Sequence, residues 1–356
     1  MIKNKFSKFK QIDQIKRLRG TFATRYESTR LDANERISPF NNKFIKNIKK
    51  KINSNHFTAY PEIEEIYDLL SKKFNLERLN FLITAGSDAA IRHCFELFTE
   101  PKSKIITLNP TFGMYDVYAK SFRTKQIKVN YNSNLELDIN FLIKSIDKDI
   151  SMIMMANPNS PTGTIIEEKF IKEILIKAQK NNCYVVIDEA YFGFYKKNYV
   201  NLINKFRNLI IIRTFSKAAG MAGLRAGYII SNQINIKRMY AFRPMYEINS
   251  ISCLVIKEIF KNSIIITKYI KETELGKKYL INELNKLGYS YYDGFANFIL
   301  VNMKSSGKIN KLKDILLKSN ILYRTAPNIK ACRNHLRFTL GPIKYMKLLV
   351  RVLKKM

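Results

Sequence analysis

Cysteine and histidine are scarce in this chain of 356 residues, and their spacing excludes several kinds of site. The four cysteines lie 89, 70 and 79 residues apart, with no CxxC pair, at Cys94, Cys183, Cys253 and Cys332. We expect reduced thiols, with the first two in the core. None of the three histidines pairs with another at i and i+4, so we expect no metal site.

Long apolar runs are missing as well. No stretch reaches the roughly 18 apolar residues that indicate a membrane-spanning helix. Residues 1–16 contain no apolar segment of the kind found in secretory signal peptides. The sequence therefore predicts a cytoplasmic protein without a membrane partner.

Acidic residues are outnumbered, with 29 Asp and Glu against 62 Lys and Arg and a net charge of +33. Such a charge is typical of proteins that bind nucleic acid. However, the lysines are scattered from Lys3 to Lys355, without an arginine-rich arm or a basic stripe with interleaved aromatics. We expect no nucleic-acid partner. The charge favours anionic, phosphorylated small molecules instead.

The residues that are present indicate a globular α/β protein, with 46% hydrophobic and 12% aromatic residues. Short apolar runs alternate with amphipathic stretches, as in a mostly parallel central sheet flanked by helices. Helices are expected at residues 89–98 and 169–180. Strands are expected at residues 81–84, 104–108, 151–156, 184–187, 209–212 and 227–230, the last one antiparallel to a neighbour.

The pattern changes near residue 243, where a second, smaller α+β domain is expected to begin. A long helix is predicted at residues 248–287, and strands at 298–301, 321–324 and 336–340. We predict a large domain at residues 45–243 and a small domain at 244–356. Residues 1–44 are expected to join the small domain.

Polar residues gather where the predicted strands end, which is where open α/β sheets bind their ligands. Asp188 directly follows an apolar strand, as a helix cap would or as a partner of a buried cationic ligand would. The turn at Ala85–Asp88 precedes a helix, and its backbone N–H groups suit a phosphate. Each feature alone is a weak signal.

Residues 213–228 read RTFSKAAGMAGLRAGY and are the most informative stretch. Small side chains after Lys217 leave room for a bulky ligand, and partial desolvation is expected to lower the pKa of its amine from about 10.4 towards neutrality. A nucleophilic lysine needs that change in order to form an imine. Ser216 and Arg225 could both contact a phosphate.

Taken together, these stretches resemble the histidinol-phosphate aminotransferase family, within the class I and II aminotransferases of fold type I that use pyridoxal phosphate (PLP). The resemblance follows the family's order over residues 31–342. It rests on nine segments, namely LDANERISPF, AYPEIEEI, ITAGSDAAI, NPTFGMY, NPNSPTG, VVIDEAYFGF, RTFSKAAGMAGLRAGY, PMYEINS and LRFTLGP.

The resemblance implies a PLP site and a role for each matching residue. Lys217 matches the lysine that carries the cofactor as a Schiff base and moves the substrate proton. Asp188 would pair with the pyridinium nitrogen, and Tyr191 would bond to the ring oxygen. Tyr115 would stack on the ring. The cofactor phosphate would be held by Ser87, Asp88, Ser216 and Arg225, and by Tyr60 from the partner subunit of a homodimer.

Two arginines and one asparagine match substrate-binding positions of the family. Arg337 would bind the substrate carboxylate, and Arg324 would bind the substrate's own phosphate. Asn34 lies in the N-terminal segment that closes over the substrate in relatives. The family's cofactor-contacting asparagine is replaced here by Ser160, so either its hydroxyl takes over, or Asn157 or Asn159 reaches the cofactor.

The resemblance implies transamination, from an amino donor such as glutamate to a small keto or aldehyde acceptor. A carboxylate held by Arg337 would leave the substrate Cα–H bond directed towards Lys217. The alternative is decarboxylation of a phosphorylated amino acid, as in threonine-phosphate decarboxylases, which share most of these motifs. The donor, the acceptor and the pathway stay open, between histidine synthesis and surface-polysaccharide or phosphonate metabolism.

Overall fold

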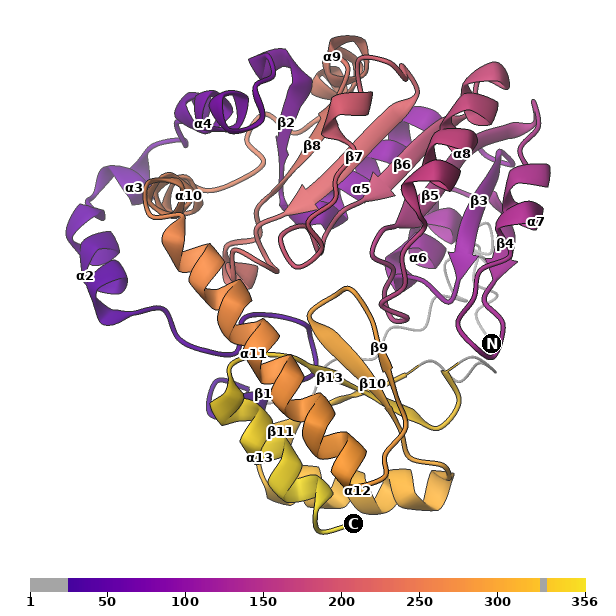
Figure 1. Cartoon of the computed structure of the whole chain (residues 1–356). Coiled ribbons are helices and arrows are strands. Elements are labelled where there is room, and N and C mark those ends of the chain that lie inside the picture. The colour runs from indigo at the N-terminus through magenta and orange to yellow at the C-terminus, as the bar shows by residue number, and fades with distance from the viewer. Residues whose placement is uncertain (1–24, 327–331) are drawn as a thin grey trace, which may run out of the picture.

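The computed structural model describes residues 25–326 and 332–356. Figure 1 shows a large sheet with helices around it, and below it a smaller sheet that packs against helices from the end of the chain. The long helix α11 (Ile264–Lys286) runs from the larger part to the smaller one. None of the described helices has the length and apolar character that crossing a membrane requires.

The large sheet has seven strands in the order β2-β8-β7-β6-β5-β3-β4. β8 is antiparallel to both of its neighbours, and the other neighbouring strands are parallel. This confirms the predicted mostly parallel sheet and its antiparallel strand. The strands are β2 (Phe81–Thr84), β3 (Lys104–Asn109), β4 (Lys125–Asn130), β5 (Ile150–Ala156), β6 (Tyr184–Asp188), β7 (Leu209–Thr214) and β8 (Gly227–Ser231).

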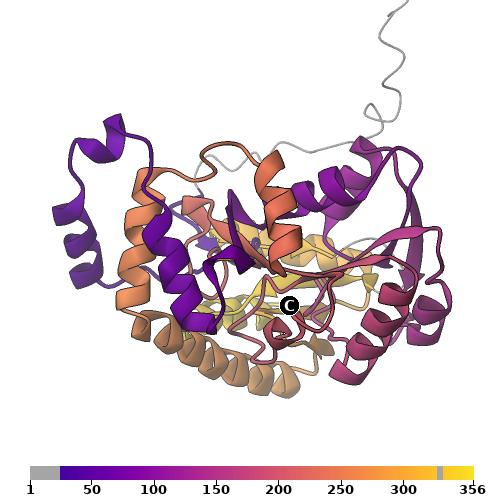
Figure 2. The same cartoon turned by 90° about the horizontal axis from the view of Figure 1, so that it is seen from above.

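Helices cover both faces of this sheet (Figure 2). Successive strand side chains point to opposite faces, so Phe81 and Ile83 join one buried apolar cluster while Leu82 joins another. The surrounding helices are α2 (Asn42–Lys51), α3 (Asn55–Thr58), α4 (Glu64–Phe74), α5 (Gly86–Phe98), α6 (Gly113–Ser121), α7 (Ile139–Lys144), α8 (Glu168–Lys180), α9 (Gln233–Phe242) and α10 (Ser250–Lys261).

The C-terminal part has its own apolar core, which α11 and a four-stranded antiparallel sheet in the order β12-β13-β10-β9 enclose. Near the N-terminus, β1 (Thr29–Arg30) pairs in parallel with β11 (Ile321–Leu322), so this segment packs with the C-terminal part. The remaining elements are β9 (Tyr291–Asp293), β10 (Phe298–Asn302), α12 (Ser306–Lys318), β12 (Arg324–Thr325), β13 (His335–Thr339) and α13 (Ile343–Leu353). The three domain boundaries stay predictions, and residues 1–24 of the first segment lie outside the described residues.

Two expectations about secondary structure were wrong, and one edge strand was not expected. The single helix at residues 248–287 is two helices, because Asn262 caps α10 with its side-chain amide on the Glu258 carbonyl, and the next helix begins at Ile264 with Ser263 as its N-cap. The strand at residues 321–324 is divided between β11 and β12. The edge strand β4 was missed because most of its side chains are polar and at least partly exposed, which weakens the apolar signal.

Candidate active site

Four chain segments that follow the ends of β2, β5, β6 and β7 contribute the central residues of the site. Asp188 is the last residue of β6, and Lys217 lies three residues beyond the end of β7. Ser160 follows β5, and the turn at Ala85–Asp88 follows β2 and begins α5. These segments meet at one edge of the sheet, because the carboxyl ends of parallel strands lie side by side.

Asp188 is a buried carboxylate, with 3% of its surface exposed. The Tyr115 hydroxyl donates to its Oδ2 at 3.0 Å, and the Ala190 N–H donates to its Oδ1 at 3.0 Å. Burial raises the pKa of Asp188 to about 6, although both hydrogen bonds oppose that shift. A cation placed against this carboxylate would favour its ionised form.

The stacking role expected for Tyr115 is corrected by the structure. Its ring is 0% exposed, so neither face is available to a ligand. The hydroxyl bonded to Asp188 instead makes Tyr115 a support for that carboxylate. Phe112, in the same NPTFGMY segment, is 36% exposed and meets Tyr115 edge to face at 5.9 Å. Sequence reasoning missed Phe112, although a second aromatic in that segment was a visible signal.

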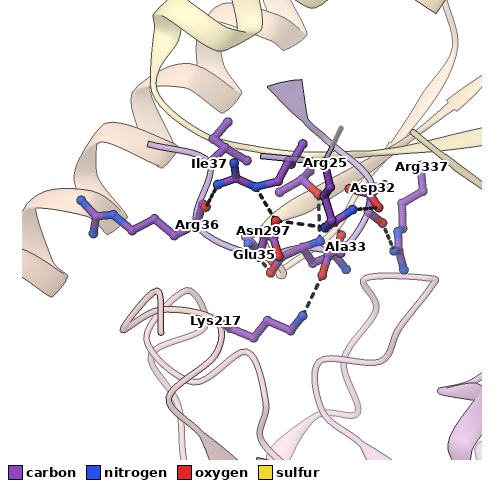
Figure 3. A network of polar contacts seen from close by, with 12 residues as sticks. Arg25, Asp32, Ala33, Glu35, Arg36, Ile37, Lys217, Asn297 and Arg337 are labelled. Atoms are coloured by element: carbon purple, nitrogen blue, oxygen red, sulfur yellow. Dashed lines mark hydrogen bonds and ion pairs between the residues drawn. The ribbon is translucent and has the colours of Figure 1, made fainter. Parts of the chain in front are cut away.

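Lys217 points towards the N-terminal segment (Figure 3), where its Nζ donates to the Ala33 carbonyl at 2.9 Å. Burial, reinforced by the nearby positive charge of Arg337, lowers the pKa of the Lys217 amine from 10.5 to about 8. The direction agrees with the shift expected from its small neighbours. With that pKa, about a tenth of this amine is unprotonated at pH 7, against well under a hundredth for an ordinary lysine, and a nucleophile requires the unprotonated form.

Asn34 from the N-terminal segment meets Tyr191, which lies three residues beyond the end of β6. The Asn34 side-chain amide donates to the Tyr191 hydroxyl at 2.9 Å. Asn34 has a φ of 55°, in the left-handed region that asparagine tolerates better than most residues. Thr339 and Asn297 hold its backbone N–H and carbonyl, at 2.9 and 3.2 Å. Neither Thr339 nor Asn297 was identified from the sequence.

The N-terminus of α5 forms the turn that the sequence suggested for a phosphate. The first N–H groups of a helix have no partner within the helix, and they attract anions. Arg225 lies beside this turn, with its guanidinium 3.2 Å from the Asp88 carboxylate. On the β7 side, the Ser216 hydroxyl accepts a hydrogen bond from Thr214 at 3.0 Å.

Gly227 allows α5 to begin so close to β8. A Cβ atom added at this glycine would lie 2.7 Å from the Arg213 carbonyl oxygen, 2.8 Å from the Gly86 carbonyl carbon and 3.0 Å from the Ser87 nitrogen. No larger residue fits there without moving the helix terminus. The glycine therefore brings the turn of α5 next to the segment that contains Arg225.

The structure distinguishes between the residues considered for the family's missing asparagine. The amide nitrogen of Asn157 donates to Tyr199 and to the Ile166 carbonyl, and its oxygen accepts from the Ile166 N–H. Asn159 is similarly bonded to Pro110 and Thr111. Both asparagine amides are therefore occupied by neighbouring groups, which favours Ser160 among the three alternatives.

Arg337 lies between Ser160 and the N-terminal segment. Its guanidinium donates to the Asp32 carbonyl at 2.7 Å and to the Ser160 hydroxyl at 3.4 Å, and its Nε is buried without a partner. Arg324 is its register partner across β12 and β13, but its side chain is exposed. Both arginines therefore belong to one side of the site, and Arg337 has an unsatisfied donor there.

Tyr60 lies apart from the other candidates. Its side chain is 76% exposed, and its ring stacks on Tyr246 at 4.2 Å with the two planes 6° apart. Tyr246 belongs to the segment between α9 and α10. An exposed aromatic pair of this kind suits contact with another protein surface.

A buried ion pair behind the site was not anticipated. Arg213 is 1% exposed, and its guanidinium lies 2.7 Å from the Glu189 carboxylate. Glu189 directly follows Asp188, and Arg213 lies four residues before Lys217. The pair thus joins the ends of β6 and β7 and fixes the spacing of the two central residues. A charged residue within an apolar strand was the sequence signal for it.

A cavity of about 440 Å³ opens over Lys217 and Ser216. Its other walls include Arg25, Arg30 and Arg225, so positive groups dominate the lining. On the N-terminal side, Arg25 contacts Glu35 at 3.0 Å (Figure 3). Arg30 contacts the same carboxylate at 2.6 Å. The size and charge of this cavity suit an anionic small molecule.

Known proteins are similar to this chain in sequence and in fold. Residues 29–353 match the family model described as aminotransferase class I and II. The histidinol-phosphate aminotransferase of Thermoanaerobacter sp. (strain X514) is 33% identical over 333 residues, 92% of each chain. The crystal structure of the histidinol-phosphate aminotransferase from Clostridium acetobutylicum is 26% identical and has a TM-score of 0.81, over 92% of this chain and 98% of that one.

A third comparison is informative about the cofactor. The histidinol-phosphate aminotransferase from Sinorhizobium meliloti, in complex with pyridoxal-5'-phosphate, has a TM-score of 0.85 at 18% identity and covers 99% of both chains. At that identity the likeness concerns the fold. The shared fold includes the strands β2, β5, β6 and β7, whose ends position the candidate site.

Proposed function

The chain belongs to the aminotransferase class I and II family, and from this premise we propose that it transfers an amino group from an amino acid, such as glutamate, to a small phosphorylated keto or aldehyde acceptor. It is a PLP-dependent aminotransferase. The decarboxylase alternative is not favoured, because relatives over 30% identical along nine-tenths of the chain are aminotransferases. The observation that carries this proposal is the placement of Lys217 and Asp188 at neighbouring strand ends, which the buried Arg213–Glu189 pair joins.

The chemistry of the donor set fits PLP. A buried carboxylate with a raised pKa suits a cationic ring nitrogen, and an amine with a lowered pKa suits the aldehyde. The N–H groups of α5, together with Ser87, Ser216 and Arg225, suit the phosphate. When bound, PLP withdraws electrons from the substrate's α-carbon.

We assign each residue a task at that site. Asp188, supported by the Tyr115 hydroxyl, would hold the ring nitrogen. Tyr191 and Ser160 would donate to the ring oxygen, and the exposed ring of Phe112 would cover one face. Lys217 Nζ would move a proton between the substrate Cα and the cofactor carbon, which an amine titrating near 8 can do in both directions.

The substrate would be bound by the two arginines on the opposite side. Arg337 would take the α-carboxylate, since its buried Nε lacks a partner and its other nitrogens contact only neutral oxygens. Arg324 and the positively charged cavity wall would favour a phosphorylated acceptor. Asn34 would close the site by holding Tyr191. The names of the relatives make histidinol phosphate the first substrate to test.

The active unit would be a homodimer. The stacked Tyr60 and Tyr246 lie on an exposed surface, where Tyr60 would reach the cofactor phosphate of the partner subunit. Each active site would then contain residues from both copies.

A screen of amino donors and acceptors, followed by absorbance, tests the function. Glutamate or histidinol phosphate should shift the absorbance of the bound cofactor, and a matching oxo product should appear. Carbon dioxide release without an oxo acid would contradict transamination. Lys217→Ala should abolish the absorbance of the lysine-bound cofactor, whereas Lys237→Ala, at an exposed position of α9, should leave it intact. Survival of the band in Lys217→Ala would refute the assignment.

A further inference from the structure

A buried histidine lies outside the site and between two carboxylates. His93 is on α5, and 6% of its side chain is exposed. Its Nε2 is 2.6 Å from the carboxylate of Glu247, whose side chain is 5% exposed, and its Nδ1 is 3.2 Å from that of Glu96. We call these three residues the His93 cluster.

The geometry of the cluster suits a doubly protonated imidazole, which can donate to both carboxylates. A neutral imidazole donates from one ring nitrogen only, so one of the two carboxylates would face a lone pair. Burial lowers the pKa of His93, but the hydrogen bonds to Glu247 and Glu96 outweigh it and raise the pKa above its usual value. The charged groups that face His93 are these two carboxylates, and Glu96 also pairs with Arg92 at 2.8 Å.

Glu247 connects the cluster to the phosphate-binding turn. Its second carboxylate oxygen accepts the Ala85 N–H at 3.0 Å, immediately before the first residue of α5. Glu247 also follows Tyr246, which stacks on Tyr60. The Glu247 carboxylate therefore contacts α5 at two places, at His93 and at the N-cap residue Ala85. In the chain, Glu247 is also joined directly to the exposed aromatic pair through Tyr246.

We propose that Glu247, held by protonated His93, is a positioning residue that fixes the turn at Ala85–Asp88 for the cofactor phosphate and joins this turn to the Tyr60–Tyr246 pair. The inference rests on the proposed function, because it takes that turn as the phosphate site. It adds residues that touch neither cofactor nor substrate and act through the Ala85 N–H.

Loss of the His93 proton has a defined consequence. Glu247 would then remain buried beside a neutral ring that can satisfy only one of its two carboxylate neighbours. A raised histidine pKa means that the stabilising contact is complete at low pH and is lost as the pH rises through the folded-state value. The turn, and with it the hold on the cofactor phosphate, should weaken over that range.

The test measures PLP release from the holoenzyme between pH 6 and 9, alongside His93 titration by NMR of ¹³C-labelled histidine. Three histidines make assignment simple. Glu247→Gln should lower the His93 pKa, release PLP about tenfold faster at pH 7, as expected for loss of a charge-assisted hydrogen bond, and flatten the pH dependence. Glu96→Gln is the matched control: it should also lower the His93 pKa but retain PLP at pH 6, since Glu96 does not contact the turn.

Release from Glu247→Gln that equals wild type at every pH would overturn the inference while leaving the proposed function intact. A wild-type protein that binds no PLP would refute the proposed function itself. If Glu247→Gln does not fold, as judged by its thermal unfolding, the wild-type profile decides. The rate of PLP release from the wild-type protein must then rise with pH, with the same midpoint as the His93 titration. A release curve with a different midpoint contradicts the role of the cluster.

Discussion

At the scale of single residues, burial tunes the two central groups in opposite senses. Lys217 loses proton affinity and Asp188 gains it, because low-dielectric surroundings disfavour whichever form is charged. The first shift favours the neutral, nucleophilic amine, and the second leaves a buried carboxylate that a cationic ligand group would ionise. The two titrations can be measured separately.

The Lys217 pKa predicts how fast the cofactor-free protein captures PLP. With a value of about 8, the unprotonated fraction rises about tenfold between pH 7 and 9 and then levels off. The second-order rate constant from stopped-flow absorbance should follow this curve. The same experiment with pyridoxal, which has no phosphate, separates titration of the cofactor phosphate from titration of Lys217. A rate that still climbs about tenfold per pH unit at pH 9 would mean an unperturbed lysine.

Asp188→Asn should inactivate the enzyme but stabilise the cofactor-free protein. The carboxyl pKa is raised to about 6, so the folded state destabilises the ionised form by up to about 3 kcal/mol. This penalty is complete above about pH 6 and disappears as the pH falls towards about 4. Urea unfolding at several pH values measures the difference.

Asp314→Asn provides the control for that experiment, since Asp314 is exposed on α12. Its effect on the free energy of unfolding should be within about 0.5 kcal/mol. Equal stability of Asp188→Asn and wild type at pH 7.5 would contradict the raised pKa.

At the scale of elements, the site depends on how closely helix ends approach strand ends. The turn of α5 lies against β8 because Gly227 has no side chain, and the buried Arg213–Glu189 pair connects β6 to β7. The residues that make these contacts do not act on the reacting atoms, but they set the spacing of the residues that do. A small change in one of them should therefore alter cofactor binding.

Gly227→Ala tests this dependence. The added Cβ would press on the backbone of Gly86 and Ser87, so we expect a loss of about 1–3 kcal/mol in stability and weaker PLP binding. Gly307→Ala on α12 is the matched control, because a Cβ there meets no atom within 4 Å. Thermal unfolding and equilibrium dialysis of PLP report the two effects. Wild-type PLP affinity in Gly227→Ala would show that the close contact is not needed.

At the scale of the whole molecule, the site draws on segments from nearly the full chain. Asn34 from the N-terminal segment, Tyr191 from the segment after β6 and Thr339 from β13 form one hydrogen-bonded series. The proposed dimer extends this to a second copy through Tyr60.

Mixed dimers can establish whether Tyr60 acts in the partner's site. Lys217→Ala and Tyr60→Ala should each have low activity as pure dimers. Random mixing makes half of the dimers mixed, and each mixed dimer contains one site with both native residues, so about one quarter of wild-type activity should return. The measurement is the rate of product formation after joint refolding. Activity that does not exceed the average of the two parents would place Tyr60 in its own subunit's site or in neither.

The sequence alone determined the fold class, the family and most strand positions. Buried strands such as residues 184–188 are apolar runs that end at a polar residue, and that signal is local. The nine ordered segments predicted Lys217, Asp188 and Arg337 as members of one site. Local signals failed where the chain is amphipathic or polar, as in the edge strand β4 and at the break at Asn262.

Only the tertiary structure decided which atoms are free and which are already bonded. It showed that the Tyr115 ring is buried and that the Asn157 amide is already bonded, placed Ser160 beside Arg337, and brought His93 to Glu247 across 154 positions of sequence. Hydrogen-bond satisfaction and burial depend on neighbours that are distant in sequence, so no local pattern encodes them.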